Sequence, residues 1–305
     1  MSPHVRRALA LVLVALVVAT GCTFAGRWQW NRHVARDALI RVVERNYAAE
    51  PVPLDEVLPS ADAALGTQDV WRRAVVTGRY LPGATVLLRN RPVESTPGYH
   101  VLVPLVVEEG GEVGAVLVVN RGFVPMGEDG SASVDAPAPP SGRVEVTVRL
   151  RLDEPRARAA GAGQVQAISV AQVLDQAPDA SALDGRAAYR AYGALADEDP
   201  APAQALVPLP VPSTDPGSHL SYAFQWWTFA LGALVGFSVM ARRELVDARA
   251  GAEGGPEAPG APGPGGDDGT PPRAPRTPRA ARPARRNRGP SAEDVEDALI
   301  DAQLR

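Results

Sequence analysis

The sequence has no lysine and a single cysteine, and the lack of a second cysteine excludes several kinds of site at once. Zinc ribbons, CxxxC copper sites, thioredoxin motifs and CxxCH haem attachment all need at least two cysteines, whereas Cys22 stands alone. No GxSxG, HExxH, P-loop or paired-carboxylate pattern occurs either. We therefore expect no enzymatic activity. A net charge of −4 gives no reason to expect a nucleic-acid partner.

Large apolar residues are almost absent from 246–290, which consists mainly of Ala, Gly, Pro and Arg. Such a segment cannot bury enough surface to offset its ordering entropy, so we expect it to be disordered. Its arginine-rich part, 273–288, would be attracted to anionic lipid, although a solvated tail without a fixed partner fits equally well. Beyond it, Ser291 is a suitable N-cap for a short helix over 291–304.

Two long apolar runs, Ala8–Gly26 and Tyr222–Ala241, are each flanked by paired arginines on the outer side. Each run spans about 28–30 Å as a helix, which matches the hydrocarbon core of a bilayer. The positive-inside rule places both flanks in the cytoplasm. The sequence thus predicts a multi-pass protein of the cell membrane with cytoplasmic residues 1–7, spans at 8–26 and 222–241, an extracytoplasmic domain over 27–221, and a cytoplasmic tail over 242–305. Cleavage and lipidation at Cys22, which would leave a lipid anchor, is the alternative.

The stretch between the runs is rich in β-strand patterns. Strands are expected at 71–80, 85–91, 99–107, 115–120, 143–152, 189–195 and 205–209, separated by turns that contain Gly or Pro. The strand at 143–152 alternates apolar and polar residues, so it should have one buried face. Pro104 suggests an edge strand or a bulge, and Asn120–Gly122 suggests a strand end entering a turn. The predicted fold is a membrane α+β protein whose β-rich domain is an antiparallel barrel or sandwich.

Helical patterns occur at three further places. The segment 27–44 should continue the first run as helix, and 170–177 should be a short helix capped by Ser169. In the second run, Gln225 shares a helix face with a small-xxx-small pair, Gly232 and Gly236. This face is expected to meet another helix, either the first span or a partner protein.

Four tryptophans lie just after the first apolar run or in the first turns of the second, as expected for rings that prefer the headgroup layer of a membrane. His219 lies at the same level, where an imidazole among aromatic rings could ligate haem iron. From the residues alone, an interfacial histidine that hydrogen-bonds backbone or lipid fits better. His100 is expected to be a surface or satisfied core histidine, and nothing else supports His33 as a ligand. The four tryptophans are Trp28, Trp30, Trp226 and Trp227.

Arginines in the strand region offer a second kind of candidate site. Arg89, Arg91 and Arg121 could pair with a propionate or a lipid phosphate. Ordinary salt bridges with Glu94 or Glu108 are the expected alternative.

Several short motifs in a fixed order resemble the surfeit locus protein 1 family of cytochrome c oxidase assembly factors. They are GRWQWNR at 26–32, PGYH at 97–100 followed by Pro104-Leu105, NRGFVP at 120–125, and HLSYAFQW at 219–226. The resemblance covers about 10–245, with Phe123 where tryptophan is usual and a poor match over 155–205.

The resemblance implies a bacterial membrane protein that assists the biogenesis of a haem-copper cytochrome c oxidase. It implies haem a as a transient cofactor, held for or delivered to the catalytic subunit, with haem a synthase as a further candidate partner. The alternative is a scaffold that holds an oxidase intermediate without touching haem. By the same resemblance, His219 is the candidate contact to haem iron. The candidate cofactor-binding residues are His219, Tyr222, Gln225, Trp226, Trp28 and Arg32.

Overall fold

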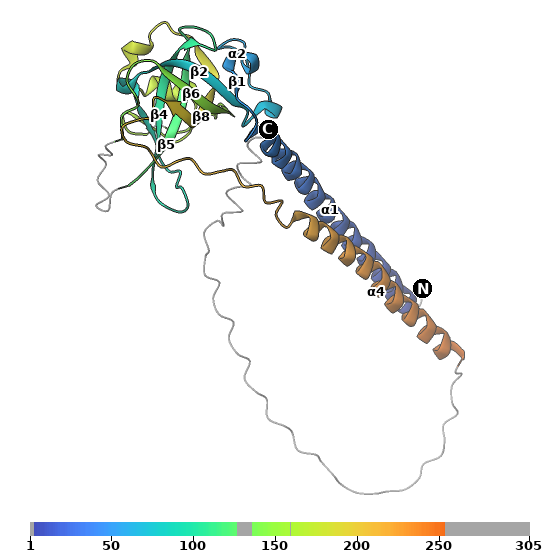
Figure 1. Cartoon of the computed structure of the whole chain (residues 1–305). Coiled ribbons are helices and arrows are strands. Elements are labelled where there is room, and N and C mark those ends of the chain that lie inside the picture. Colours follow the sequence, from blue (N-terminus) through green and yellow to red (C-terminus); the bar gives the residue numbers. More distant parts are fainter. Residues whose placement is uncertain (1–2, 127–135, 159, 254–305) are drawn as a thin grey trace, which may run out of the picture. The chain divides into compact units, whose positions relative to one another are not determined.

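The computed structural model describes residues 3–126, 136–158 and 160–253 (Figure 1). The expected helix at 291–304 and the arginine-rich segment lie outside these residues. The long helices are α1 (Pro3–Asn46) and α4 (His219–Glu253), and the short ones are α2 (Leu54–Val57) and α3 (Val170–Asp175), with 3₁₀ turns η1 (Thr67–Asp69), η2 (Pro82–Ala84) and η3 (Ala180–Leu183). The strands are β1 (Val52–Pro53), β2 (Arg73–Tyr80), β3 (Val86–Leu88), β4 (Gly98–Glu109), β5 (Val116–Pro125), β6 (Val144–Leu152), β7 (Gln164–Val165) and β8 (Ala188–Asp199).

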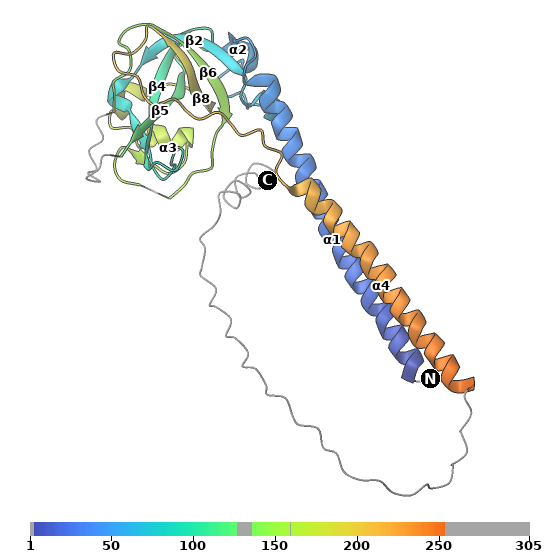
Figure 2. The same ribbon diagram turned by 60° about the horizontal axis from the view of Figure 1, so that its bottom comes forward.

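α1 runs for 44 residues without a break, which confirms that 27–44 continues the first apolar run as helix. α1 and α4 are both long and apolar enough to cross a membrane. They lie side by side in both views of the chain (Figures 1 and 2). Large side chains such as Leu13, Val17 and Leu231 are more than 60% exposed on the outside of this pair. Apolar exposure of this extent suits a lipid environment.

Small residues form the contact between α1 and α4. Because a short side chain lets two backbones approach closely, the alanines make a tight seam. The glycines of the second run are not part of it, since Gly232 and Gly236 are exposed and a Cβ there would meet no atom within 4 Å. The expectation that this face packs on the first span is wrong, and its contact with a partner protein stays a prediction. The buried small residues are Ala8, Ala15, Ala19 and Gly26 on α1, and Ala223, Ala230 and Ala241 on α4.

Five strands close into a barrel in the order β2–β6–β8–β5–β4, with β4 pairing back onto β2. The short strands β1, β3 and β7 add to its edges. Five pairings are antiparallel, whereas β1–β2, β3–β7 and β5–β8 are parallel. The sheet is therefore mixed, and the expectation of an antiparallel one holds only in part. A parallel β5–β8 pair is possible because a long connection, which includes β6 and α3, separates the two strands in the chain.

Two apolar cores lie on the two faces of the sheet. Alternate residues of β6, from Val144 to Leu150, point into the barrel and are each at most 1% exposed. This confirms the predicted buried face of the strand. Outside the barrel, α3 covers a second cluster that includes Leu102, Val118 and Val173. The helix predicted at 170–177 is confirmed, but Ser169 makes no side-chain cap; the Val170 N–H donates to Asp153 instead.

Two strand predictions fail for identifiable reasons. Pro104 lies in β4, which pairs with β5 on one side and with β3 and then β2 on the other, so it is not in an edge strand. It stands at the point where the neighbour on that other side changes from β3 to β2. Its missing N–H therefore costs no ladder hydrogen bond. Asn120–Gly122 is not a turn, because β5 continues to Pro125. Gly122 has a φ of +148°, and a Cβ there would meet Leu206 at 2.7 Å. Because Gly122 has no side chain, the segment 205–209 can pack closely against β5 at this point. The strand expected at 205–209 is reduced there to one bridge, between Val207 and Phe123.

Candidate functional site

His219 begins α4 and faces α1, where its ring is held by Gln29. The His219 Nδ1 atom lies 3.0 Å from Gln29 Oε1. Since a carboxamide oxygen can only accept, this hydrogen bond places the proton on Nδ1 and leaves the Nε2 lone pair available. No hydrogen bond to Nε2 occurs among the described residues. This is the arrangement in which proteins present a neutral imidazole to a metal, with the second nitrogen fixing the ring.

Indole rings pack the two helices together beside this histidine. The Trp30 and Trp227 ring centroids are 6.0 Å apart, and Phe224 meets Trp227 edge-on at 5.7 Å. Gly26 lies directly beneath the Trp227 indole, which would overlap with any Cβ at that position. Trp30 also contacts the ring of His33, at 5.9 Å. Trp30 and Trp227 are therefore part of the helix contact, in addition to any preference for a membrane surface.

Apart from Arg32, which is half-buried, the other candidates from the motifs face outward. Trp28 is 57% exposed, Tyr222 47% and Trp226 36%, and Gln225 is also exposed. The guanidinium of Arg32 lies 5.5 Å from the Trp28 ring on the same helix. Helical periodicity explains the split, because the face of α4 that carries Ala223, Trp227 and Ala230 is the one that meets α1. The structure thus brings His219 to the helix contact, whereas Tyr222 and Trp226 present exposed rings on α4 and Trp28 an exposed ring on α1.

His100 lies in the outer core of the barrel and is fully satisfied there. Its Nε2 donates to the Arg91 carbonyl oxygen at 3.1 Å, and its Nδ1 accepts from the Asn120 side-chain amide at 3.3 Å. Burial, together with the positive charge of Arg91, lowers the pKa of His100 to about 4. The expectation of a satisfied core histidine is confirmed.

The strand arginines pair with acids other than the expected ones. Arg91 makes a two-bond contact with Glu154, at 3.0 and 2.9 Å. Arg121 bonds to Glu198 at 2.6 Å, with side-chain exposures of 1% and 5%. Glu94 and Glu108 are not their partners because register, not sequence proximity, sets the neighbours: β5 and β8 lie side by side, and Glu154 follows β6. Neither Arg91 nor Arg121 is available to a propionate.

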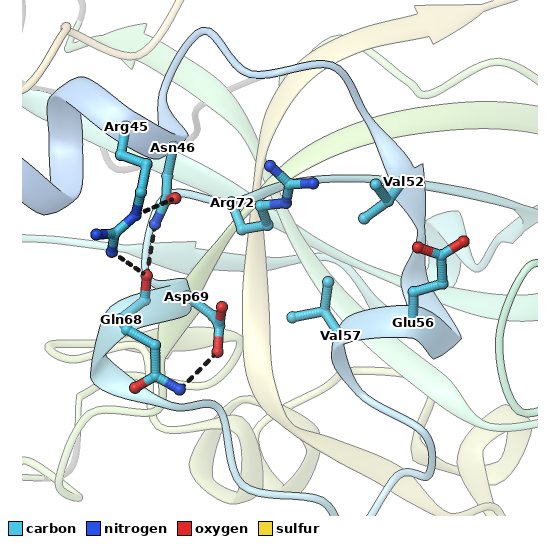
Figure 3. Close-up of a pocket in the computed structure, with 8 residues that line it drawn as sticks. All are labelled: Arg45, Asn46, Val52, Glu56, Val57, Gln68, Asp69 and Arg72. Atoms are coloured by element: carbon cyan, nitrogen blue, oxygen red, sulfur yellow. Dashed lines mark hydrogen bonds between the residues drawn. The ribbon is translucent and has the colours of Figure 1, made fainter.

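A pocket of about 530 Å³ lies where α1 reaches the barrel, and no pattern in the sequence pointed to it (Figure 3). Asn46 donates to the carbonyl oxygens of Gln68 and Val70 at 2.7 and 2.8 Å, and Arg45 reaches Gln68 as well. His219, Gln29, Trp30 and Trp227 form what we call the His219 corner. Asn46 is 17 residues beyond Gln29, about 25 Å along the helix, so the pocket and the His219 corner are separate places. Its lining residues are Arg45, Asn46, Val52, Glu56, Val57, Gln68, Asp69 and Arg72.

Comparison with known proteins places this geometry in a family. A family model described as the SURF1 family matches residues 16–231, which include α1 from residue 16 on, the whole barrel and the start of α4 with His219. The chain belongs to the SURF1 family. Uncharacterized SURF1-like proteins of Mycobacterium bovis and of two strains of Mycobacterium tuberculosis are each 33% identical over 255 residues, 81% of this chain and 88% of each relative. Membership in the SURF1 family is consistent with a role in oxidase assembly.

Proposed function

We propose that this SURF1-family protein is a non-catalytic assembly factor of the cell membrane that holds haem a for a haem-copper cytochrome c oxidase. The proposed receiver is the catalytic subunit, and haem a synthase is the proposed donor. The observation that carries the proposal is the His219–Gln29 hydrogen bond, which leaves Nε2 free of protein partners in the described part of the chain.

The residues of the corner suit an apolar, planar ligand with a metal centre. Haem supplies an iron that accepts a neutral imidazole nitrogen and a large ring that needs an apolar surface. Tyr222 and Trp226 lie one and two turns along α4 from His219 and present exposed aromatic surface. Gln29 orients the imidazole from the other helix. These residues bind and orient, and none of them has to move a proton.

Topology is part of the proposal. Paired arginines at the outer ends of both apolar runs favour cytoplasmic termini and an extracytoplasmic barrel. The corner then lies at the membrane surface, where an apolar cofactor can enter from lipid.

Haem retention tests the ligand role. Full-length protein purified from cells that make haem a should show a haem spectrum. His219→Ala should reduce bound haem more than about tenfold, because the loss of an orienting partner alone typically costs about 10–100-fold in metal affinity and the loss of the ligand costs more. Gln29→Leu, which leaves the ring unoriented, should weaken retention less. His4→Ala, at the opposite end of the helix pair, is the matched control and should retain wild-type haem. Equal haem in His219→Ala and the control would refute the ligand role.

A scaffold that stabilises an oxidase intermediate without haem is the second candidate. It is favoured by the exposed face of α4 that carries Tyr222, Phe229, Gly232 and Gly236, which α1 leaves uncovered. Under this alternative, deletion of the gene lowers oxidase levels while the purified protein is haem-free, and Gly232→Leu lowers oxidase levels as strongly as deletion.

A further inference from the structure

Three arginines and two aromatic rings form a continuous surface on the outside of the barrel, where α1 ends. We call it the arginine–aromatic patch; it consists of Tyr47, Trp71, Arg73, Arg149 and Arg151. The Arg149 guanidinium lies 3.9 Å from the Tyr47 ring centroid, and Arg151 lies 3.7 Å from that of Trp71. The two rings are 5.8 Å apart. Arg73 stands directly opposite Arg149 in the β2–β6 register.

The patch is held in place by the backbone around it. Trp71 has a φ of +69°, which is unusual for an aromatic residue. Two hydrogen bonds that extend the β2–β6 ladder hold it there. The Trp71 N–H donates to the Leu150 carbonyl oxygen at 2.8 Å, and the Leu150 N–H donates to the Arg72 carbonyl oxygen at 2.9 Å. Arg149 Nε also donates to the Tyr47 carbonyl oxygen at 3.3 Å. Because rings and guanidiniums are stacked, little rotamer freedom remains to be lost when a ligand binds.

Positive charge on this patch is not balanced within the described residues. Arg73, Arg149 and Arg151 make no ion pair there, and the Nε atoms of Arg73 and Arg151 are buried without an acceptor. Glu154, whose carboxylate Arg151 influences, is already paired with Arg91 through two bonds. Each guanidinium carries five N–H donors. Of these, one terminal nitrogen of Arg73 donates to the Ala49 carbonyl oxygen at 3.5 Å and Arg149 Nε to that of Tyr47, so most of the donors of the patch remain unused within the described residues.

The distance of the patch from the apolar part of α1 argues against lipid as its ligand. Tyr47 is 21 residues beyond Gly26, about 31 Å along the helix, whereas the headgroup layer adds only about 5–8 Å to each side of the hydrocarbon core. Three charges separated by two rings favour a ligand with several carboxylates over one small anion. Arg, Tyr and Trp are also the residue types that dominate binding energy at protein interfaces.

We propose that the arginine–aromatic patch docks an acidic segment of a partner protein on the barrel side of the membrane. This docking does not depend on haem binding. Carboxylates of the segment take the unused guanidinium donors, and the rings cover its apolar stems.

The test uses fluorescein-labelled octaglutamate as the acidic probe and full-length protein in nanodiscs of neutral phosphatidylcholine. Anisotropy should report binding that weakens with salt. Arg149→Gln with Arg151→Gln should weaken it about tenfold or more, because two charge-assisted contacts are lost. Arg156→Gln with Arg190→Gln, an equal charge change at two exposed positions elsewhere on the barrel, is the matched control and should stay within about twofold.

Further arms make the outcomes decisive. If the glutamine pair fails to fold, Arg149→Lys with Arg151→Lys keeps the charge but loses the fork and stacking geometry, and should still weaken binding about threefold. Equal binding by the patch and control variants would overturn the proposal. So would loss of binding in discs that contain phosphatidylglycerol, which would assign the patch to lipid, or competition by inorganic phosphate as effective as by unlabelled peptide, which would assign it to a small anion. Haem content of the patch variants should equal wild type, so this test and that of His219 fail separately.

Discussion

Gly26 decides how closely the two long helices approach. It is buried beneath the Trp227 indole, and no side chain fits there. Gly21, less than two turns earlier on the same helix, would have no atom within 4 Å of an added Cβ and tolerates a side chain. Gly26 belongs to the first of the family-like motifs, but only the packing of α4 gives it a physical role.

Gly26→Leu should therefore separate α1 and α4 and cost about 1–3 kcal/mol through overpacking. For a chain of this size that corresponds to a fall in Tm of roughly 2–12 °C, measured by tryptophan fluorescence because Trp30 and Trp227 report the contact. Gly21→Leu is the control and should leave the transition unchanged. An unchanged Tm for Gly26→Leu would contradict the close contact.

His100 should make the barrel less stable in mild acid. Its folded pKa of about 4 lies below the ordinary 6.5, so the unfolded state binds the proton first as pH falls. The contribution is fully present above pH 6.5 and is lost toward pH 4, by about 2 kcal/mol between pH 7 and pH 5. Glu154, which also faces His100, stays ionised across this window because Arg91 lowers its pKa.

Urea midpoints at pH 7 and pH 5 measure this loss. His100→Gln should flatten the difference, although it lowers stability at pH 7 by removing buried hydrogen bonds. His33→Gln serves as the control, with a wild-type pH dependence. A His100→Gln protein that lost as much stability as wild type between the two pH values would show that another group titrates.

At the scale of elements, β5 and β8 are joined by a buried ion pair as well as by their ladder. Arg121 and Glu198 are almost fully enclosed, and Arg121 lies 5.3 Å from the Tyr80 ring. Burial next to Glu198 also raises the pKa of Tyr80 well above its ordinary value, so the phenol stays neutral. Removing one member of such a pair leaves an uncompensated charge in the core.

Arg121→Met should thus cost about 3–5 kcal/mol of unfolding free energy, whereas Arg121→Met combined with Glu198→Leu should recover a large part of it. Chemical unfolding followed by the circular dichroism of the β-sheet provides the measurement. Arg79→Met breaks an exposed pair with Glu108 and should cost at most about 1 kcal/mol. Equal costs for the single and double variants would contradict the prediction, because they would show that the unpaired Glu198 carboxylate is not the source of the loss.

Elements with a strong local pattern could be predicted, and those fixed by distant neighbours could not. β6 alternates because only one of its faces is buried in the barrel. α1 and α4 carry apolar runs because apolar surroundings are expected on all sides of both helices. The parallel β5–β8 pair, the continuation of β5 through Gly122 and the place of Pro104 depend on which strands become neighbours, which no local pattern encodes. Likewise the face of α4 that meets α1 could not be predicted, because its alanines form a less distinctive pattern than Gly232 and Gly236.

At the scale of the whole molecule, the proposed topology, which rests on the paired arginines, assigns the barrel and the end of α4 to opposite sides of the membrane. In a Cys22→Ser background, Ser181→Cys on the barrel should react with a membrane-impermeant maleimide in intact spheroplasts. Arg249→Cys near the end of α4 should react only after permeabilisation. Both positions are exposed in the structure, so folding does not hide them. The reverse labelling pattern would refute the topology and the proposal built on it.

The unbroken course of α1 has a geometric consequence. A continuous helix couples rotation to length, since each residue turns the chain by about 100° and lifts it by about 1.5 Å. The number of helical residues between Gln29 and Asn46 therefore sets the rotational orientation of the barrel about the helix axis. One inserted residue would swing the barrel by more than a right angle, whereas seven would return it nearly to its original heading about 10 Å farther out. A partner that binds both the barrel and the helix pair would then find each contact surface intact but the two surfaces rotated relative to each other.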